Sequence, residues 1–577
     1  MSSYNCRHDI GWPPGLSLHL DSTLNCLLNI TCFVFVLEMD PGPAAASAKD
    51  TCDLIFVFAG MLAALVNEEI KQTNLLSPQP QITESYDFVV VGAGSAGSVV
   101  ASRLSENPEW RVLLLETGGP ETPLMDIPGY FGLNFGNAAV HFFESEPNSK
   151  ANNGEKLLLP RGRVLGGSGT INANVYVRGN RRDYDRWAKM GNPGWDYKNV
   201  LRYFKKSENN IDPVLSRDTK YHGTGGPLSI SRHSPDTLAL GLLDAFEWLG
   251  FEKRDFNGKE QVGVGLTQLT TNGTTRQSAN VAFLNPVKHR ENLHIKTHST
   301  VTKIVLHETK RHAKGVEYLD SDGKKHLILA GKEVIVSAGA LESPKILMLS
   351  GIGPKRHLKS KNIPLHTDLP VGKNLQDHPL ILPPIAFKIP NPTLSEGLSA
   401  KVYQLTNYLE RKTGSLIEIP NPIMAYKSFT EDVMEADISY FSTKTLYGTG
   451  CFAETDLYTH IGFIPVLMRP ESKGQILLRD SNPLSDPVVE LNLLHSSRDF
   501  NIIKKAMKYL VKLKDAPAMA NLNLTLDTTP LPRCSKYTFG EEDYWDCVVR
   551  AYSGTCYHQA STQMHRDFSV INVNNFC

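Results

Sequence analysis

The chain has 577 residues, 41% of them hydrophobic, so it can bury large cores, and its length predicts about two to four structural units. Sixty Lys and Arg residues balance sixty Asp and Glu residues, which leaves no net charge to attract a polyanion. The composition therefore indicates a globular protein, and it excludes a disordered chain and a protein that binds nucleic acid.

Residues 1–85 predict a leader region. Two apolar runs, 24–37 and 54–66, are both shorter than the roughly 20 residues that a membrane-spanning helix needs, so we expect no stable membrane span. They fit the apolar segment of a signal peptide, especially if translation starts at Met39, which places the second run about fifteen residues in. Three Asn-X-Thr triplets fit the same route: Asn29, Asn272 and Asn523. We expect secretion to the extracellular space, with an intracellular location as the alternative.

The nine cysteines lie near the two ends of the chain, and nearly 400 residues between Cys52 and Cys451 contain none. No pair has the Cys-x-x-Cys spacing of zinc or iron–sulfur ligands, so we expect no metal site. The pattern favours buried thiols or one or two disulfides in the last part of the chain.

The first long element pattern begins at Tyr86. Residues 86–91 form a short apolar run, 92–97 a glycine turn, 98–107 an amphipathic helix pattern and 111–116 a second apolar run. This order of strand, turn, helix and strand places Gly92-x-Gly94-x-x-Gly97 directly between a strand and a helix, which is the context of a dinucleotide-binding turn.

Each residue of that turn has a physical role. Gly92 permits the tight turn, Gly94 lets a pyrophosphate approach the backbone, and Gly97 lets the helix pack closely on the strand. Ser95 and Ala96 lie in the turn that opens the helix, and the unpaired N–H groups at the helix N-terminus can bind a phosphate. Glu116 ends the next strand, where its carboxylate can accept the two ribose hydroxyls. These residues predict a nucleotide site but leave FAD and NAD both open.

The remaining elements follow from their periodicity. Helices are expected over 195–206, 237–249, 341–349, 499–513 and 541–551, and strands over 293–295, 302–307, 315–319, 327–329, 333–337, 461–466, 474–478 and 488–491. Ser321-Asp322-Gly323 predicts a hairpin turn, 161–169 is glycine-rich and reads as a loop, and 390–444 is mixed. The pattern predicts an α/β fold: a Rossmann-like domain with a parallel sheet, interleaved with a second α+β domain built on an antiparallel sheet.

Two long stretches resemble signatures of the glucose–methanol–choline (GMC) flavoprotein oxidoreductases. They are GRVLGGSGTINANVYVRG at 162–179, followed by Asp185, and GALESPKILMLSGIG at 339–353. A third stretch, DLPVGKNLQDH at 368–378, is also similar to the family, and the likeness is greatest to its insect glucose dehydrogenase branch. It implies FAD as cofactor rather than NAD, because neither long signature belongs to NAD-dependent enzymes. It also implies an N-terminal family region over 86–385 and a C-terminal region over 386–577.

The resemblance assigns further residues to the cofactor. Gly166 and Gly167 carry no side chain where a flat ring system and a pyrophosphate must lie against the backbone. The other residues that the resemblance places at FAD are Arg163, Val164, Ser168, Asn172, Ala173, Asn174, Val175 and Val301.

His558 matches the position of the family's catalytic histidine. A neutral imidazole with an ordinary pKa near 6.5 can take the hydroxyl proton of an alcohol while the carbinol hydride passes to the flavin. After Thr562 the sequence departs from the family pattern, so a second catalytic His or Asn is not recognised, and His565 is too close in sequence to His558 to replace it.

The expected function is FAD-dependent oxidation of the CH–OH group of an alcohol, sugar or sterol, with oxygen, a quinone or a redox protein as electron acceptor. The alternative, raised by the shortened C-terminal pattern, is a truncated, non-catalytic GMC-like protein that binds FAD weakly or not at all.

Overall fold

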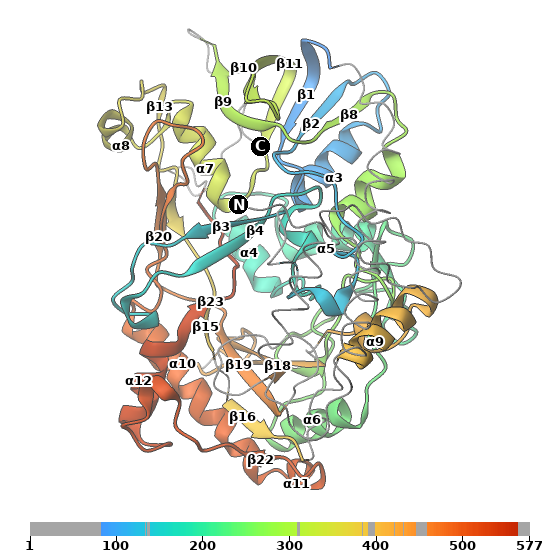
Figure 1. Ribbon diagram of the computed structural model, residues 1–577, viewed down its shortest axis with the longest axis vertical. Coiled ribbons are helices and arrows are strands. Elements are labelled where there is room, and N and C mark those ends of the chain that lie inside the picture. Colours follow the sequence, from blue (N-terminus) through green and yellow to red (C-terminus); the bar gives the residue numbers. More distant parts are fainter. Residues whose placement is uncertain are drawn as a thin grey trace, which may run out of the picture.

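The computed structural model describes residues 82–562, apart from 133, 135–138, 308–311, 383–384, 391–397, 420–421, 431 and 446–458. The two apolar runs, Met39, Asn29 and His565 therefore lie outside the described residues. Figure 1 shows one sheet at the top of the molecule and a second sheet at the bottom, with a hairpin and short helices between them. No helix within the described part of the chain combines the length and apolar character needed to cross a bilayer.

The upper sheet has the strand order β8-β2-β1-β11-β10-β9. Its strands are β1 (Ser85–Val91), β2 (Val112–Leu115), β8 (Leu293–Lys296), β9 (Thr300–Leu306), β10 (Ala313–Leu319) and β11 (Lys325–Val336). The first four in the order are parallel, and β10 and β9 continue the sheet in antiparallel fashion. Helices α3 (Ser95–Leu104) and α7 (Gly339–Leu349) follow the adjacent parallel strands β1 and β11. The predicted parallel sheet with helices is confirmed.

Strand β11 corrects one expectation. The predicted strands 327–329 and 333–337 are a single strand, which pairs with β10 through its first half and with β1 through much of its length. The pairing with β1 shifts between Tyr86 and Phe88, and this irregularity lets β11 continue as one strand past Gly331. The predicted turn at 321–323 is confirmed, because the N–H of Asp320 donates to the carbonyl of Lys324 at 3.1 Å.

The lower sheet has the order β22-β16-β19-β18-β17-β7, with β15 and β23 paired beside β19, and all its pairs are antiparallel. Its strands are β7 (Gly263–Leu266), β15 (Pro379–Ile381), β16 (Ile385–Lys388), β17 (Ile423–Lys427), β18 (Ile438–Thr445), β19 (His460–Leu467), β22 (Thr525–Leu526) and β23 (Ser553–Thr555). Because β7 precedes β8 to β11 in the chain, the two sheets are interleaved as predicted. The mixed stretch 390–444 supplies β17 and most of β18, which the sequence did not reveal.

Helices cover the lower sheet, and a hairpin lies between the two sheets (Figure 1). The helices are α6 (Thr237–Trp248), α10 (Ser497–Leu510), α11 (Pro517–Asn521) and α12 (Glu542–Tyr552), and the hairpin is β3 (Val140–Glu144) with β4 (Leu158–Gly162). The other helices are α4 (Arg181–Lys189), α5 (Tyr197–Ser207), α8 (Lys355–Ser360) and α9 (Leu398–Arg411). The other strands are β5 (Glu208–Asn210), β6 (Leu228–Ile230), β12 (Ile352–Gly353), β13 (Thr367–Asp368), β14 (Lys373–Leu375), β20 (Gly474–Leu477) and β21 (Val488–Glu490).

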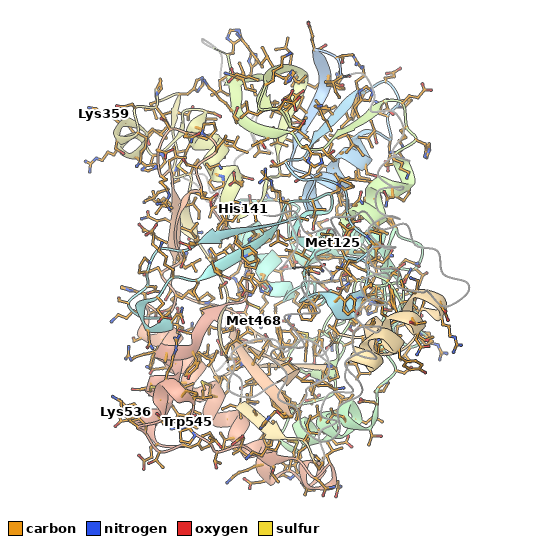
Figure 2. All side chains as sticks on the ribbon, viewed as in Figure 1. Met125, His141, Lys359, Met468, Lys536 and Trp545 are labelled. Carbon is orange, nitrogen blue, oxygen red and sulfur yellow. A yellow bond between two sulfur atoms is a disulfide. The ribbon has the colours of Figure 1, made fainter. Side chains whose placement is uncertain are left out.

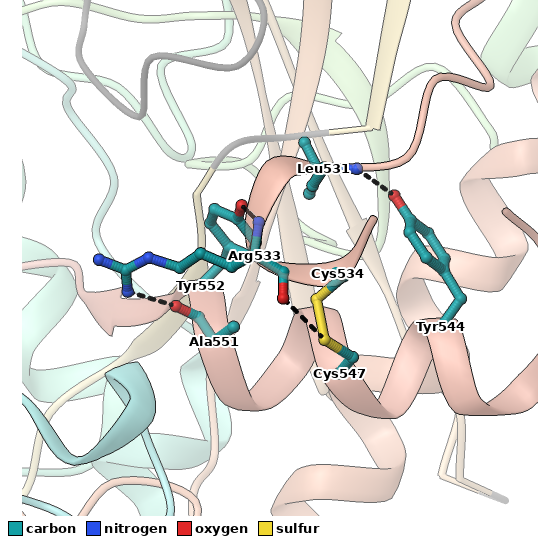
Figure 3. Close-up of a disulfide and its surroundings, with 7 residues drawn as sticks. All are labelled: Leu531, Arg533, Cys534, Tyr544, Cys547, Ala551 and Tyr552. Atoms are coloured by element: carbon teal, nitrogen blue, oxygen red, sulfur yellow. Dashed lines mark hydrogen bonds between the residues drawn. A yellow bond between two sulfur atoms is a disulfide. The ribbon is translucent and has the colours of Figure 1, made fainter. Parts of the chain in front are cut away.

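A disulfide joins Cys534 to Cys547 and ties the turn at 532–534 to α12 (Figure 3). Two tyrosines of α12 reinforce this link, because the N–H of Leu531 donates to the hydroxyl of Tyr544 and the N–H of Arg533 donates to the hydroxyl of Tyr552. This bond is one of the late disulfides that the cysteine pattern predicted.

A buried cluster of charges anchors the end of the first signature. The guanidinium of Arg178 donates to Glu208. The ring of His222 bonds both Glu208 Oε1, at 2.9 Å, and Asp255 Oδ2, at 2.7 Å. Burial alone would lower the pKa of His222, but the hydrogen bonds to Asp255 and Glu208 outweigh it and raise the pKa to about 9. Two cations therefore face two carboxylates, and the cluster holds the chain that leads from Val175 to Arg178.

We expect His222→Gln to reduce the free energy of unfolding by roughly 3 kcal/mol at neutral pH, because it removes the cation that pairs with Asp255 and leaves Glu208 with Arg178 alone. Since the folded pKa of His222 lies above the unfolded value, its stabilising effect is fully present below about pH 6.5 and is lost as pH rises through about 9. Urea unfolding of both proteins at several pH values measures this difference, with the exposed His289→Gln as control. An unchanged difference at about pH 10 would contradict the prediction.

Candidate functional site

The predicted glycine turn is built so tightly that side chains are excluded from two of its positions. Gly92 has a φ of +93°, and a Cβ atom there would lie 2.7 Å from the carbonyl oxygen of Ser337, at the end of β11. A Cβ atom on Gly97 would lie 1.9 Å from the carbonyl oxygen of Gly92. The turn therefore brings β1, β11 and α3 together through bare backbone.

The N-terminus of α3 is open to an anion. Its N-cap residue, Gly94, offers no side-chain hydrogen bond, and the first turn contains no acidic residue. Ser95 and Ala96, the first two helical residues, are exposed. The amides at this end and the positive end of the helix dipole are therefore available to a negatively charged group such as a phosphate.

The loop of the first signature lies directly on this turn. A Cβ atom on Gly167 would lie 2.6 Å from Cα of Gly94, and the N–H of Gly166 donates to the carbonyl of Ala93 at 2.8 Å. The hydroxyl of Ser168 accepts a hydrogen bond from the N–H of Gly162 at 3.1 Å and so closes the loop on β4. The two glycine segments, far apart in sequence, thus form one continuous backbone surface.

Glu116 and Val301 lie beside this surface. The carboxylate of Glu116 accepts hydrogen bonds from the N–H of Ala93 at 2.8 Å and of Gly118 at 2.9 Å. Burial raises the pKa of Glu116, and these hydrogen bonds oppose the effect. The carbonyl of Glu116 also accepts from the N–H of Ser299 at 2.8 Å, which places Val301, near the start of β9, close to it. Val164 bridges to Gly119 in the same region, and Arg163 is exposed.

The segment 172–175 is held from behind by Arg276, which the sequence did not single out. Nη1 of Arg276 donates to Oδ1 of Asn172 at 2.9 Å and to the carbonyl of Gly169 at 3.3 Å. Burial lowers the pKa of Arg276 to about 10. Asn174 has a φ of 60°, and its amide nitrogen donates to the carbonyl of Thr270. Ala173 is half-buried between these two asparagines.

Two buried polar atoms, one in this segment and one in the arginine behind it, have no hydrogen-bond partner within the part of the chain that the structure describes. They are Oδ1 of Asn174 and Nη2 of Arg276. Because leaving such atoms unpaired costs roughly 1–3 kcal/mol each, they are sites where a polar cofactor edge would fit.

His558 forms a pair with a second histidine. Nδ1 of His558 lies 3.0 Å from Nδ1 of His378, and the ring planes are nearly perpendicular, at 82°. The buried carboxylate of Asp377 fixes both residues, because it accepts hydrogen bonds from the N–H of His378 at 2.7 Å and of His558 at 3.0 Å. It also accepts from the side chains of Thr555 and Gln559.

Both imidazoles are more acidic than an ordinary histidine. The surrounding protein removes part of the water around the ring of His558, which disfavours its charged form. This desolvation and the nearby cation of Arg161 lower the pKa of His558 below its usual 6.5. Burial and the neighbouring His558 lower the pKa of His378, while a hydrogen bond to the backbone of Met468 opposes this shift. Met468 lies near the middle of the molecule (Figure 2). The pair is therefore neutral at physiological pH, and the sequence-based expectation of an ordinary pKa for His558 was wrong. His558 is nevertheless exposed, so a substrate can reach it.

Hydrogen bonds connect the histidine pair to the glycine surface. Arg161 precedes Gly162, which packs on Gly167, and its guanidinium donates to the carbonyl of Tyr557 at 3.0 Å. On the other side of His558, the hydroxyl of Thr562 donates to the carbonyl of Ala340, at the start of α7. Two residues that flank His558, Tyr557 and Ser561, have positive φ values of 61° and 68°.

The predicted residues therefore gather in one region of the molecule. The glycine turn, the loop of the first signature, Glu116 and the start of β9 meet around α3, and His558 is tethered to the same loop. Sequence reasoning missed His378, Asp377, Arg161 and Arg276. The first two stand in the recognised stretch 368–378 and Arg161 directly precedes the first signature, whereas nothing in the sequence distinguishes Arg276. Within the described ranges, no three His, Cys, Asp or Glu side chains converge as metal ligands.

Solved structures share this fold. One is pyridoxine 4-oxidase from Mesorbium loti, which is 25% identical and aligns over 84% of this chain and 90% of that one with a TM-score of 0.73. Formate oxidase is 22% identical and aligns over 84% and 89% of the two chains with a TM-score of 0.75. The predicted fold class is confirmed by these neighbours.

Relatives of known activity are similar over most of their length. The chain is 35% identical over 564 residues to a glucose dehydrogenase (FAD, quinone) of Drosophila pseudoobscura pseudoobscura, which covers 92% of this chain and 87% of that protein. It is 31% identical to an ecdysone oxidase of Bombyx mori, over 85% and 76% of the two chains. An oxygen-dependent choline dehydrogenase of Brucella suis is 37% identical over 72% and 75%. Two GMC oxidoreductase family patterns match residues 86–380 and 470–574, so this chain belongs to the GMC oxidoreductase family.

Proposed function

We propose that this GMC oxidoreductase binds FAD and oxidises the CH–OH group of an alcohol, sugar or sterol, with His558 as general base. The observation that carries this proposal is the contact between the two glycine segments, with a neutral histidine pair tethered to the same loop. The contact provides a nucleotide site, and the pair provides a proton acceptor beside it.

The residues present fit FAD. The open N-terminus of α3 suits the pyrophosphate, and the surface at Gly94 and Gly167 lets a flat group lie against backbone. We assign Glu116 and Val301 to the ribose and adenine end, and Asn172 to Val175 to the flavin end, where the unpaired Oδ1 of Asn174 lies. When bound, FAD accepts the hydride that leaves the carbinol carbon.

The chain itself supplies the proton acceptor. Oxidation of a carbinol releases a hydride from carbon and a proton from oxygen, and the product is a carbonyl compound. A neutral imidazole can take that proton, and the lowered pKa of His558 keeps it neutral down to acidic pH.

His378 determines which nitrogen of His558 accepts the proton. The hydrogen bond of His378 to the backbone of Met468 requires an N–H on His378, because a carbonyl only accepts. If that N–H is on Nε2, the Nδ1 of neutral His378 is an acceptor and Nδ1 of His558 must donate to it. Nε2 of His558 then carries the lone pair, as a general base needs. We therefore propose His378 and Asp377 as positioning residues.

The electron acceptor is proposed by analogy. The names of the relatives specify a quinone for the glucose dehydrogenase and oxygen for the choline dehydrogenase. We propose that one of these, or a redox protein, reoxidises the flavin of this enzyme.

We also propose that the protein is secreted. The disulfide between Cys534 and Cys547 is of the kind that persists in oxidising compartments, and Asn272 and Asn523 of the two described glycosylation triplets are exposed. Expression in a secretory eukaryotic host should yield protein in the medium whose mobility increases after glycosidase treatment. Retention in the cytosol without glycan would count against secretion.

We expect Gly167→Ala to reduce the FAD content of the purified protein to below about one tenth, because its Cβ atom would strike Cα of Gly94. Gly154→Ala is a matched control: Gly154 also has a positive φ, of +81°, but a Cβ atom there meets nothing within 4 Å. The visible absorbance of bound flavin relative to protein measures the content. Equal FAD content in the two variants would contradict the assignment of the glycine surface to the cofactor site.

We expect His558→Asn to retain FAD but to slow its reduction by an alcohol by roughly 10²–10⁴-fold, because the proton acceptor is lost. Stopped-flow bleaching of the flavin measures this rate. In the wild-type enzyme, the acid limb of kcat/KM should lie below pH 6.5, because the pKa of His558 is lowered.

The exposed His289→Asn serves as the control and should keep the wild-type rate. A His558→Asn enzyme that reduces its flavin at the wild-type rate would exclude His558 as the base. FAD that binds but is reduced by no alcohol tested would instead contradict the proposed reaction.

A further inference from the structure

The wall next to the histidine pair comes from one face of the lower sheet. Side chains alternate along β18, so Phe441 lies on the opposite face from Tyr440. The hydroxyl of Tyr440 donates to the carbonyl of Ala506 in α10, so the face that carries Tyr440 packs on that helix. The face that carries Phe441 is therefore turned toward the rest of the molecule.

Phe441 and Met468 bridge two apolar clusters on this face. The first cluster also packs against Val175, the last residue of the segment assigned to the flavin end, and against Val177, two residues further on. The second also packs against Leu382 and Cys556, which follow the strands β15 and β23 that deliver the two histidines. Phe441 and Met468 therefore lie between the flavin segment and the histidine pair, and the hydrogen bond of His378 to the backbone of Met468 agrees with this placement.

The apolar side chains of this wall keep accessible surface, whereas the hydroxyl-bearing side chains on the same face are almost fully buried. Val175, Leu382, Phe441 and Met468 are only partly buried. By contrast, Ser439 and Thr443, which alternate with Phe441 on the same face of β18, are 0% and 5% exposed. The hydroxyl of Tyr426, on the neighbouring strand, belongs to a residue that is 1% exposed. A substrate at His558 therefore meets hydrocarbon on this side.

This difference decides which alcohols fit. Each hydroxyl of a polyol that is moved from water onto an apolar wall loses hydrogen bonds that the wall does not replace. The transfer of each methylene group of an alkyl chain from water to the same wall is favourable in free energy. We infer that this enzyme selects alcohols with an apolar body, aliphatic or aromatic, over sugars and other polyols; this inference rests on the proposed function.

The test is the rate of flavin reduction in the FAD-loaded wild-type enzyme with three kinds of alcohol. These are a series of straight-chain primary alcohols, benzyl alcohol and glucose. We expect kcat/KM to rise by roughly three- to fourfold for each added methylene group over the first few members of the series. We expect kcat/KM for glucose to be at least about 100-fold lower than for the best member of the series. The reason is that each glucose hydroxyl that loses its hydrogen bonds to water adds to the free-energy cost of binding.

A pair of variants tests whether the wall is responsible. Met468→Gln preserves the length of the side chain but adds an amide beside the histidine pair, so it should reduce the preference for a long-chain alcohol over glucose by about tenfold. Met434→Gln makes the same change at an exposed residue, 42% accessible, outside the two clusters, and should leave the preference unchanged. FAD content and the far-UV spectrum of each variant establish that it is folded.

The outcomes distinguish the selectivity from the reaction itself. Glucose as the best substrate, or no dependence on chain length, would overturn the inference while leaving the proposed alcohol oxidation intact. An unchanged preference in a folded Met468→Gln enzyme would also overturn it. Reduction by none of these alcohols contradicts the proposed function instead.

Discussion

The architecture depends on the direct contact of two glycine segments. Cα of Gly94 lies where a side chain of Gly167 would have to be, so neither segment can approach the other unless this position is bare. The contact unites a turn between β1 and α3 with a loop that follows β4. Because β4 belongs to the hairpin between the two sheets, the same contact connects the nucleotide-binding half of the molecule to the half that carries the histidines.

A single buried acid then places the histidine that we propose as the general base. Asp377 binds the backbones of His378 and His558, residues that follow or precede the paired strands β15 and β23 by only a few positions. Asp377 is 4% exposed, and burial raises its pKa, while the hydrogen bonds that it accepts oppose this shift. An acid with such partners acts as a fixed acceptor that orders the loop, rather than as a participant in proton transfer. Asp377 thus fixes the backbone that carries both imidazoles, and the bond between their Nδ1 atoms orients the two rings.

Sequence reasoning succeeded where local patterns are strong. The continuous apolar run of β1, the glycine turn and Glu116 occur in one short stretch, so their contact in the fold could be predicted from spacing. It failed for β17 and β18, because buried strands that contain Ser439, Ser442 and Thr443 do not show a clean alternation of apolar and polar residues. His558 was found through its resemblance to the family. His378 and Arg276 were not, since their roles depend on partners distant in sequence, and the lowered pKa of His558 depends on Arg161 in the same way.

The backbone on both sides of His558 is strained. Tyr557 and Ser561 hold left-handed conformations that cost a residue with a side chain about 1–2 kcal/mol each. This energy is balanced by the pairing of Gln376 with Ala560 and by the bond from Arg161 to Tyr557. The segment therefore keeps a strained backbone conformation because two other parts of the chain bond to it. Because these partners are distant in sequence, the proposed proton acceptor takes up its position only within the complete tertiary fold.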